Sequence, residues 1–409
     1  MEHWTIFITN KSNTTNFIAS LLEENSSSDL KALNSLKGAV LSKATIDDLI
    51  NEEERHDRKI ATKNSNQSLK SMSSGEQKKI VLAYILSTKP DYIILDNPFD
   101  NLDSESKKQL KKQLKSLSSN IILIVLISRK DDAPEFINNQ AILTEKGTLK
   151  KISNSQTSIE GKDFSHFKIP AALRTIAYKN DPLIHLKNIN VSYDGHPILS
   201  NINWKINTGD FWQLKGANGS GKTTLLSMIT GENSKGYGQE LYLFGQKKGS
   251  GESIWDIKKK IGYYAPTLTH NFYGSHTIEH MLISGLNDSI GLYKYPTEIQ
   301  LRLAKDWLEV LGMSLKKDVV FLELPIGEQR LVMVARAMIK HPLLLILDEP
   351  TENLDDESAS LFVALTTKIA QESTTAILFV SHRDEPGLNP KKIFELQKTK
   401  NGAVGIILK

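Results

Sequence analysis

The sequence of 409 residues contains no cysteine. Disulfide bridges, thiol nucleophiles and zinc-thiolate centres are therefore excluded, and the composition suits a reducing compartment. Long hydrophobic runs are also missing, because the longest, residues 121–127 and 343–347, have the length of strands and are too short to cross a bilayer. Residues 1–10 lack the basic-then-apolar pattern of a signal peptide. We expect a cytoplasmic protein without a membrane span.

An excess of charge of one sign is absent too. The 51 Lys and Arg residues nearly balance the 47 Asp and Glu residues, which leaves a net charge of +4. Such a balance carries no direct signal for nucleic-acid binding, and the short lysine runs are typical of solvated faces. With 39% hydrophobic residues over this length, we expect two to three globular domains.

The chain does contain an internal repeat. Residues 71–103 match residues 323–355 at a constant offset of 252 residues. Each copy runs from a Gly-Glu-Gln triplet through a helix pattern and a proline turn to an apolar strand that ends in Asp96 or Asp348. Alternating strands and helices predict parallel α/β sheets that bind ligands at the carboxyl ends of their strands.

A polar segment separates the two copies. Residues 152–181 are weakly patterned and are interrupted by Gly161 and Pro170. We therefore predict a shortened first domain at residues 1–151, a linker at 152–181 and a complete second domain at 182–409.

One glycine-rich segment predicts a phosphate-binding loop. Residues 216–223 read Gly-Ala-Asn-Gly-Ser-Gly-Lys-Thr and fit the pattern GxxxxGK[ST]. The glycines let backbone N–H groups turn toward a phosphate chain, the following helix offers its positive end, and Lys222 supplies a mobile cation. A strand candidate at 211–214 precedes this loop and an amphipathic helix candidate at 224–230 follows it, as the pattern requires.

Taken together, these segments resemble an ATP-binding cassette (ABC) ATPase with two nucleotide-binding domains in one polypeptide. The resemblance covers nearly everything except the linker. It makes residues 216–223 the Walker A loop, 345–348 the end of the Walker B strand and 352–355 the D-loop, while residues 73–77 (Ser-Ser-Gly-Glu-Gln) are close to the signature LSGGQ. The implied fold class is α/β, with two P-loop NTPase domains of ABC type. Each would have a parallel sheet core and a helical subdomain, and the second half would add an antiparallel β subdomain.

The resemblance also implies a role for each residue of the second-half site. Lys222 would neutralise the phosphates, Glu349 would orient the attacking water and His382 would contact the γ-phosphate. Thr223 and Asp348 would hold Mg²⁺. The residues expected to bind ATP are Tyr193, Gly216, Ala217, Asn218, Gly219, Ser220, Gly221, Lys222, Thr223 and Thr224 from the second half and Ser73, Ser74, Gly75 and Gln77 from the first.

In this family two cassettes close head to tail, so that each ATP lies between one Walker A loop and the opposite signature. The second-half loop and the first-half signature make a nearly complete pair. The opposite pair is degenerate: the loop at 9–16 has no glycine and places Thr15 where the lysine belongs, Asn97 replaces the glutamate, Arg129 replaces the histidine, and the signature at 324–329 reads Leu-Pro-Ile-Gly-Glu-Gln. We expect intramolecular pairing of the halves, with one competent composite site and one without useful hydrolysis.

Three features need a separate interpretation, and one of them, Pro266, departs from the family pattern. Pro266 stands where the family places its Q-loop glutamine, so coupling to a partner must differ from the usual scheme. Tyr193 occupies the position of the adenine-stacking aromatic, although a turn aromatic that packs on its own hairpin is the alternative. Residues 276–280 match a zinc-peptidase pattern, HxxEH, but they lie on the way to the helical subdomain and we expect no zinc there.

We therefore expect an ATP- and Mg²⁺-dependent ATPase that drives or regulates a separate membrane permease for an oxyanion such as molybdate, from the inner face of the membrane. The sequence leaves two alternatives open. One is an ATPase outside transport that acts on ribosomes, nucleic acid or another complex. The other is a nucleotide-sensing regulator with negligible turnover.

Overall fold

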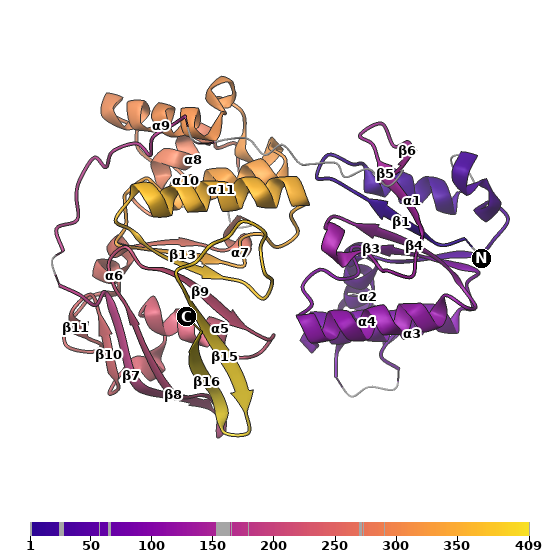
Figure 1. Cartoon of the computed structure of the whole chain (residues 1–409), viewed down its shortest axis with the longest axis horizontal. Helices are drawn as coiled ribbons and strands as arrows, with labels where there is room; N and C mark the ends of the chain where they lie inside the picture. The colour runs from indigo at the N-terminus through magenta and orange to yellow at the C-terminus, as the bar shows by residue number, and fades with distance from the viewer. Residues whose placement is uncertain are drawn as a thin grey trace. The chain divides into compact units, whose positions relative to one another are not determined.

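The computed structural model describes residues 2–23, 28–56, 58–63, 67–152, 164, 166–178, 180–269, 272, 274–289 and 291–408. The chain divides into two compact units, drawn in Figure 1. One comprises Met1–Ile159 with Asn353–Asp356, and the other comprises Glu160–Glu352 with Glu357–Lys409.

The first unit is built on a six-stranded sheet of order β2-β3-β4-β1-β5-β6. All neighbouring pairs are parallel except β5 and β6. The strands are β1 (Trp4–Phe7), β2 (Gly38–Leu41), β3 (Tyr92–Asp96), β4 (Ile122–Ile127), β5 (Asn139–Leu143) and β6 (Leu149–Lys151). The helices are α1 (Thr14–Leu22), α2 (Lys43–His56), α3 (Ser74–Ser87) and α4 (Ser104–Leu117), with short 3₁₀ helices η1 (Ser28–Leu33), η2 (Leu69–Ser71) and η3 (Lys130–Asp132).

Helices cover both faces of this sheet, which explains why its central strands are apolar throughout. Along β3, Ile93 and Leu95 face the core beneath α2, α3 and α4, whereas Tyr92 and Ile94 face the core beneath α1. Figure 1 shows α3 and α4 along one face and α1 on the other. The uninterrupted run Tyr92–Leu95 therefore follows from burial on two sides.

The second unit contains a ten-stranded sheet of order β11-β10-β7-β8-β16-β15-β9-β14-β13-β12. Its strands are β7 (Ile184–Tyr193), β8 (His196–Ile206), β9 (Phe211–Gly216), β10 (Glu240–Leu243), β11 (Gln246–Lys247), β12 (Ile261–Tyr264), β13 (Leu344–Asp348), β14 (Ala376–Val380), β15 (Lys392–Thr399) and β16 (Gly402–Leu408). The neighbours from β15 through β9, β14 and β13 to β12 are all parallel, while β7, β8, β10 and β11 form antiparallel hairpins.

The helices of the second unit are α5 (Lys222–Ile229), α6 (Ile254–Lys260), α7 (Pro266–Thr269), α8 (Ile278–Ser284), α9 (Glu298–Leu311), α10 (Ile326–Met338) and α11 (Asp356–Glu372), with 3₁₀ helices η4 (Ser234–Gly236), η5 (Ser314–Lys316) and η6 (Phe321–Glu323). Helices α8, α9 and α10 pack together as a helical layer, seen at the top of this unit in Figure 1. Where the β subdomain meets the parallel strands, Trp204 stacks on Phe394 with ring centroids 4.2 Å apart.

The predicted fold class is confirmed, with a parallel core in each unit and an antiparallel β subdomain in the second. One predicted boundary differs slightly from the structure: α5 begins at Lys222, two residues before the predicted helix start. In the described ranges, no helix combines the length and apolar character needed to cross a bilayer.

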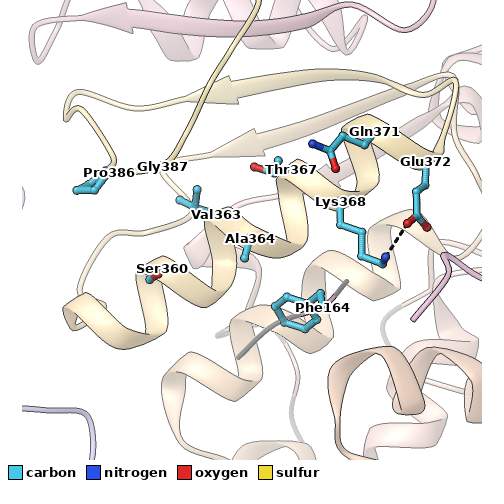
Figure 2. Close-up of a pocket in the computed structure, with 10 residues that line it drawn as sticks. All are labelled: Phe164, Ser360, Val363, Ala364, Thr367, Lys368, Gln371, Glu372, Pro386 and Gly387. Carbon is cyan, nitrogen blue, oxygen red and sulfur yellow. Dashed lines mark hydrogen bonds and ion pairs between the residues drawn. The ribbon is translucent and has the colours of Figure 1, made fainter. Parts of the chain in front are cut away.

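Part of the predicted linker packs against the second unit, while residues 153–163, 165 and 179 lie outside the described residues. Phe164 is only 6% exposed and helps line a cavity of about 520 Å³ beside α11, drawn in Figure 2. The N–H of Ile169 donates to Glu372 Oε2 at 2.9 Å, and His341 Nε2 lies 2.7 Å from the carbonyl oxygen of Pro170. The described linker residues contain no helix or strand, but these contacts attach them to one unit.

Candidate nucleotide site

Three neighbouring parallel strands of the second unit end at the same edge of the sheet. Gly216 ends β9, Val380 ends β14 and Asp348 ends β13, and these strands are adjacent in the order β9-β14-β13. The glycine-rich loop, Glu349 and His382 follow directly after them. Because the carboxyl ends of parallel strands form the usual ligand edge of an α/β sheet, the predicted site residues are brought together there.

The glycine-rich loop is open for hydrogen bonding. Gly219 and Gly221 have positive φ angles of 67° and 90°, which glycine adopts without steric cost. Their N–H groups donate to nothing in the part of the chain that the structure describes, and the buried Ser220 Oγ likewise has no partner there. A Cβ on Gly216 would collide with Ser220 Oγ. Unused donors at the start of α5 are what an anionic phosphate chain requires.

Lys222 lies at the first position of α5 and is directed back over this loop. Its Nζ donates to the carbonyl oxygen of Gly216 at 2.8 Å and to that of Ala217 at 3.4 Å. The same Nζ lies 3.8 Å from Glu349 Oε1. The cation predicted to neutralise phosphate therefore sits between the loop and the predicted catalytic carboxylate.

Glu349 and His382 contact each other directly. His382 Nδ1 lies 2.9 Å from Glu349 Oε2, and the backbone N–H of His382 donates to the same oxygen at 3.4 Å. An ionised carboxylate can only accept, so Nδ1 carries a proton in this contact. The other ring nitrogen, Nε2, is buried and has no hydrogen-bond partner among the described residues. A buried orphaned nitrogen beside the loop fits a polar ligand group at that position.

Asp348 and Thr223 provide oxygen donors of the kind that Mg²⁺ prefers. Burial raises the pKa of Asp348 above its ordinary value, and a hydrogen bond from Tyr263 opposes that shift. Tyr263 Oη donates to Asp348 Oδ2 at 3.1 Å, while Asp348 Oδ1 accepts no hydrogen bond from the described residues. Thr223 and Tyr263 both line one cavity of about 440 Å³. The hydroxyl and carboxylate donor set therefore fits a magnesium ion bound with nucleotide.

Tyr193 ends β7 and is connected to α5 through one side chain. Asn233 Nδ2 donates both to Tyr193 Oη and to Ser227 Oγ, each at 2.9 Å. Tyr193 remains 41% exposed, and the ammonium of Lys235 lies 5.9 Å from its ring centroid. The exposed ring is compatible with base stacking, so the adenine contact stays a prediction.

In the first unit, the predicted signature residues lie at the start of α3. Ser73 caps this helix: its Oγ accepts from the N–H of Glu76 at 3.4 Å, and the N–H of Ser73 donates to the Glu76 carboxylate at 2.9 Å. Ser74 Oγ donates to the carbonyl oxygen of Asn101 at 2.9 Å, and Gln77 Nε2 donates to that of Leu69 at 3.0 Å. Gly75 lies between them in the first turn, where a Cβ would meet Leu102 at 3.4 Å. This helix end is well formed, with an exposed serine at its start.

The corresponding helix of the second unit lost that cap. Pro325 is the N-cap of α10 and makes no side-chain cap hydrogen bond. Glu328, which would complete a capping box, bonds instead to Lys316 Nζ at 2.6 Å. The two signature segments are thus structurally different, as their sequences predict.

The first-unit loop that corresponds to the phosphate loop is closed by its own side chains. The N–H of Thr9 donates to Ser12 Oγ at 3.0 Å and the N–H of Ser12 returns to the carbonyl oxygen of Thr9 at 2.9 Å. Further along, the N–H of Thr14 donates to the carbonyl oxygen of Ser12 at 3.1 Å, and that of Asn16 to Asn13 Oδ1 at 3.0 Å. These amide groups are therefore already engaged within the loop.

The structure corrects one equivalence in this loop. Helices α1 and α5 begin at Thr14 and Lys222. Each start lies eight residues beyond a strand residue, Ile6 or Leu214, that holds the same place in its sheet. Thr14, and not Thr15, is therefore the counterpart of Lys222. Sequence comparison misplaced it by one because the loop has no glycine to anchor the alignment.

A second equivalence also changes. Asn97 and Glu349 follow the Walker B aspartates and share the left-handed backbone, with φ of 43° and 45°. The N–H of Ser128 donates to Asn97 Oδ1 at 3.0 Å, as that of His382 does to Glu349 Oε2. Ser128 is thus the counterpart of His382, and the prediction of Arg129 was wrong by one residue, because β4 and β14 carry too little pattern to fix their register.

Two further contacts at the site were not predicted. One is the contact of Tyr263 with Asp348, which the sequence does not single out because Tyr263 and Tyr264 are adjacent. The other comes from Lys398, whose Nζ donates to the carbonyl oxygen of Asn218 at 2.7 Å and would lie 3.4 Å from a Cβ on Gly219. Nothing in the sequence around Lys398 indicates that β15 reaches the loop.

The comparisons with known proteins agree with this site. The ABC transporter domain family matches residues 7–100 and 199–352. The ABC transporter ATP-binding protein ModF of Escherichia coli strain K12 is 39% identical over 332 residues, which cover 77% of this chain and 67% of ModF. An uncharacterised ABC transporter ATP-binding protein of Schizosaccharomyces pombe is 28% identical over 78% of this chain and 66% of its own length. The chain thus spans about two thirds of the length of these relatives.

Solved structures show the same fold over the whole chain. Archaeal ABCE1, in a model of its ribosome-bound complex with Pelota, matches with a TM-score of 0.64 and 15% identity over 100% of this chain and 74% of that one. The archaeal ribosome recycling factor aABCE1, in complex with the stalk protein aP1, matches with a TM-score of 0.63 and 14% identity over 99% of this chain and 85% of that one.

The duplicated sequence pattern, the open loop and the matched domain segments all lead to one family. The chain belongs to the ABC transporter ATP-binding family and is an ATP hydrolase.

Proposed function

We propose that this protein is a Mg²⁺-dependent ATPase with one competent site, held by the second unit and completed by the signature helix of the first. The contrast between the two phosphate loops carries the proposal. In the second unit, the N–H groups of Gly219 and Gly221 are unused by the described residues. In the first unit, the N–H of Lys11, the counterpart of Gly219, donates within the loop to Thr9 Oγ1 at 3.3 Å.

The second-unit residues would divide the reaction among them. The loop amides and Lys222 bind the phosphate chain and neutralise its charge. Glu349 accepts a hydrogen bond from the attacking water and orients it toward the γ-phosphorus, while His382 Nε2 contacts the γ-phosphate. Thr223 and Asp348 would hold Mg²⁺, which supplies further charge neutralisation when bound. A positioned base of this kind contributes about 10²–10⁴ to the rate.

The distribution of losses supports head-to-tail pairing of the halves within one chain. The second unit keeps its nucleotide loop but carries Pro325 at its signature helix. The first unit keeps Ser73 and Gly75 at its signature helix but has lost its loop and has Asn97 in place of the glutamate. Each loss therefore falls on the same one of two composite sites. Decay unrelated to pairing would scatter over both.

We further propose that the protein energises a separate membrane permease. The similarity to ModF, a transporter ATP-binding protein by name, supports this role. An oxyanion such as molybdate is the cargo class that the sequence resemblance implies. An ATPase outside transport is the alternative, and the same partner experiment tests it.

Turnover tests the catalytic part of the proposal. Glu349→Gln should keep ATP binding and lower phosphate release about 10²–10⁴-fold, because the amide cannot act as a base. Glu357→Gln, at an exposed position of α11, is the matched control and should keep most of the activity. Equal phosphate release by the wild-type and Glu349→Gln chains would contradict the proposal.

The trapped variant also tests the partner. Glu349→Gln loaded with ATP should co-sediment with membrane vesicles that carry the permease, and adding Lys222→Ala should abolish that binding. Co-sedimentation with ribosomes instead of membranes would replace the transport role with the alternative.

A further inference from the structure

Tyr263 is the polar side chain that contacts the Walker B aspartate. It lies on β12, whose residues pair in parallel with β13, and Tyr263 is opposite Ile346. Its hydroxyl donates to Asp348 Oδ2 at 3.1 Å. A tyrosine hydroxyl carries its proton at neutral pH and can therefore donate to the carboxylate.

We propose that Tyr263 is a positioning residue that orients Asp348 for the metal-nucleotide complex. This inference rests on the proposed Mg²⁺-dependent ATPase. Asp348 has two carboxylate oxygens, and Tyr263 engages Oδ2 while Oδ1 accepts no hydrogen bond from the described residues. A carboxylate fixed through one oxygen presents the other in a defined direction, which is how outer partners tune a metal ligand.

The first unit provides an internal comparison, because it retains the aspartate without the tyrosine. Val40 on β2 pairs with Ile94 on β3, as Tyr263 on β12 pairs with Ile346 on β13. Val40 is therefore the counterpart of Tyr263. Asp96 accepts no hydrogen bond from the described residues, and burial together with the charge of Asp100 raises its pKa to about 6. The hydroxyl is present only in the unit that has an open phosphate loop.

The residues next to Tyr263 cannot take over its role. Tyr264 points to the other face of β12, where its hydroxyl bonds to Arg330. Pro266 begins α7 and has no polar side chain. Among the described residues, Tyr263 is thus the only side chain that hydrogen-bonds to Asp348.

Tyr263 also lines the cavity that contains Thr223. Thr223 and Asp348 are the two residues proposed to hold the metal, so Tyr263 shares a cavity with one and bonds to the other. The alternative to a positioning role is competition, in which the Tyr263 hydroxyl occupies Asp348 and must be displaced before the metal binds. The two roles predict opposite changes in metal affinity when the hydroxyl is removed.

The test measures how much Mg²⁺ strengthens nucleotide binding. The full chain is titrated with the ATP analogue AMPPNP by calorimetry, once with Mg²⁺ and once with EDTA, for the wild type and Tyr263→Phe. We expect the ratio of the two affinities to fall about tenfold in Tyr263→Phe, while the affinity in EDTA stays within about twofold. The unchanged EDTA affinity also shows that the variant is folded.

Tyr242→Phe is the matched control, because the Tyr242 hydroxyl bonds to Glu240 at 2.7 Å in the β10–β11 hairpin. The ratio of AMPPNP affinities with Mg²⁺ and with EDTA should be the same in this variant as in the wild type. An unchanged or increased ratio in Tyr263→Phe would overturn the inference. A wild-type chain whose AMPPNP binding gains nothing from Mg²⁺ would defeat the proposed function itself.

Discussion

His382 contacts Glu349 twice, through its ring nitrogen Nδ1 at 2.9 Å and through its backbone N–H at 3.4 Å. The carboxylate proposed to polarise water is therefore fixed by the residue proposed to contact the γ-phosphate. Ser128 and Asn97 repeat the backbone contact in the first unit, but neither a carboxylate nor an imidazole is present. Both units therefore share this backbone contact, but only the second unit has the carboxylate and imidazole side chains.

Replacing His382 tests this contact. His382→Ala should lower kcat about 10²-fold, because it frees the Glu349 carboxylate and removes the ring proposed to contact the transferring phosphate. ATP affinity should change by less than about threefold. Steady-state phosphate release and calorimetric ATP binding measure the two quantities. An unaltered kcat would show that the pair serves only to stabilise the fold.

Lys222 should govern nucleotide affinity. Loss of its charged hydrogen bonds to phosphate costs about 1.5–3 kcal/mol, so Lys222→Ala should weaken ATP binding roughly 10- to 150-fold. Thr14→Ala alters the equivalent residue of the first unit and serves as the control, with no expected change. Titration with a fluorescent ATP analogue measures both. Equal effects of the two substitutions would refute the assignment of the site to the second unit.

The closed loop of the first unit predicts the binding stoichiometry. With the N–H groups of Thr9, Lys11, Thr14 and Asn16 already bonded and Thr14 in place of the lysine, the first-unit loop offers a phosphate chain fewer donors and no lysine cation. Calorimetry should therefore give one ATP per chain at saturation. A stoichiometry of two would mean that the first-unit loop rearranges to bind nucleotide.

Asp96 predicts a pH dependence of stability in the first unit. Burial raises its pKa to about 6 in the folded chain, above the unfolded value of about 4. The folded state then binds the proton more tightly, so its contribution to stability falls as the pH rises from about 4 to about 6 and levels off above. The full loss is of order 3 kcal/mol.

Asp96→Asn should remove this penalty. At pH 7.5 the variant should show slower hydrogen exchange in β3 than the wild type, and the difference should shrink toward pH 4.5. Exchange compared at each pH between the two chains measures this. A difference that is the same at both pH values would contradict the assignment to Asp96.

Much of the fold follows from the sequence, because the repeated segments contain residues that adopt specific backbone conformations. The constant offset of 252 residues reappears as paired left-handed residues, Asn97 with Glu349 and Asn101 with Asn353. The glycine pattern of residues 216–223 likewise predicts the loop and the start of α5. These features are local, so a sequence contains them directly.

The sequence-based predictions were wrong at residues whose position depends on tertiary packing. Ser128 was missed by one residue, because strand register is set by neighbouring strands and not by the strand's own apolar run. Thr14 was missed by one residue because its loop has no glycine to anchor the alignment. Tyr263 and Tyr264 are adjacent in sequence, and only the orientation of β12 determines which one reaches Asp348. Phe164 was assigned to a plain linker, although it is buried beside α11.

The most direct measurement compares ATP turnover after the same substitution at two equivalent positions, Ser74 and Ile326. We predict that Ser74→Arg lowers phosphate release at least about tenfold while ATP binding to the second unit stays within about threefold, because the arginine obstructs the signature turn opposite the bound nucleotide. Ile326→Arg should leave turnover within about twofold, and circular dichroism should show both chains folded. Loss of turnover in Ile326→Arg with full activity in folded Ser74→Arg would contradict the pairing of the first-unit signature with the second-unit site.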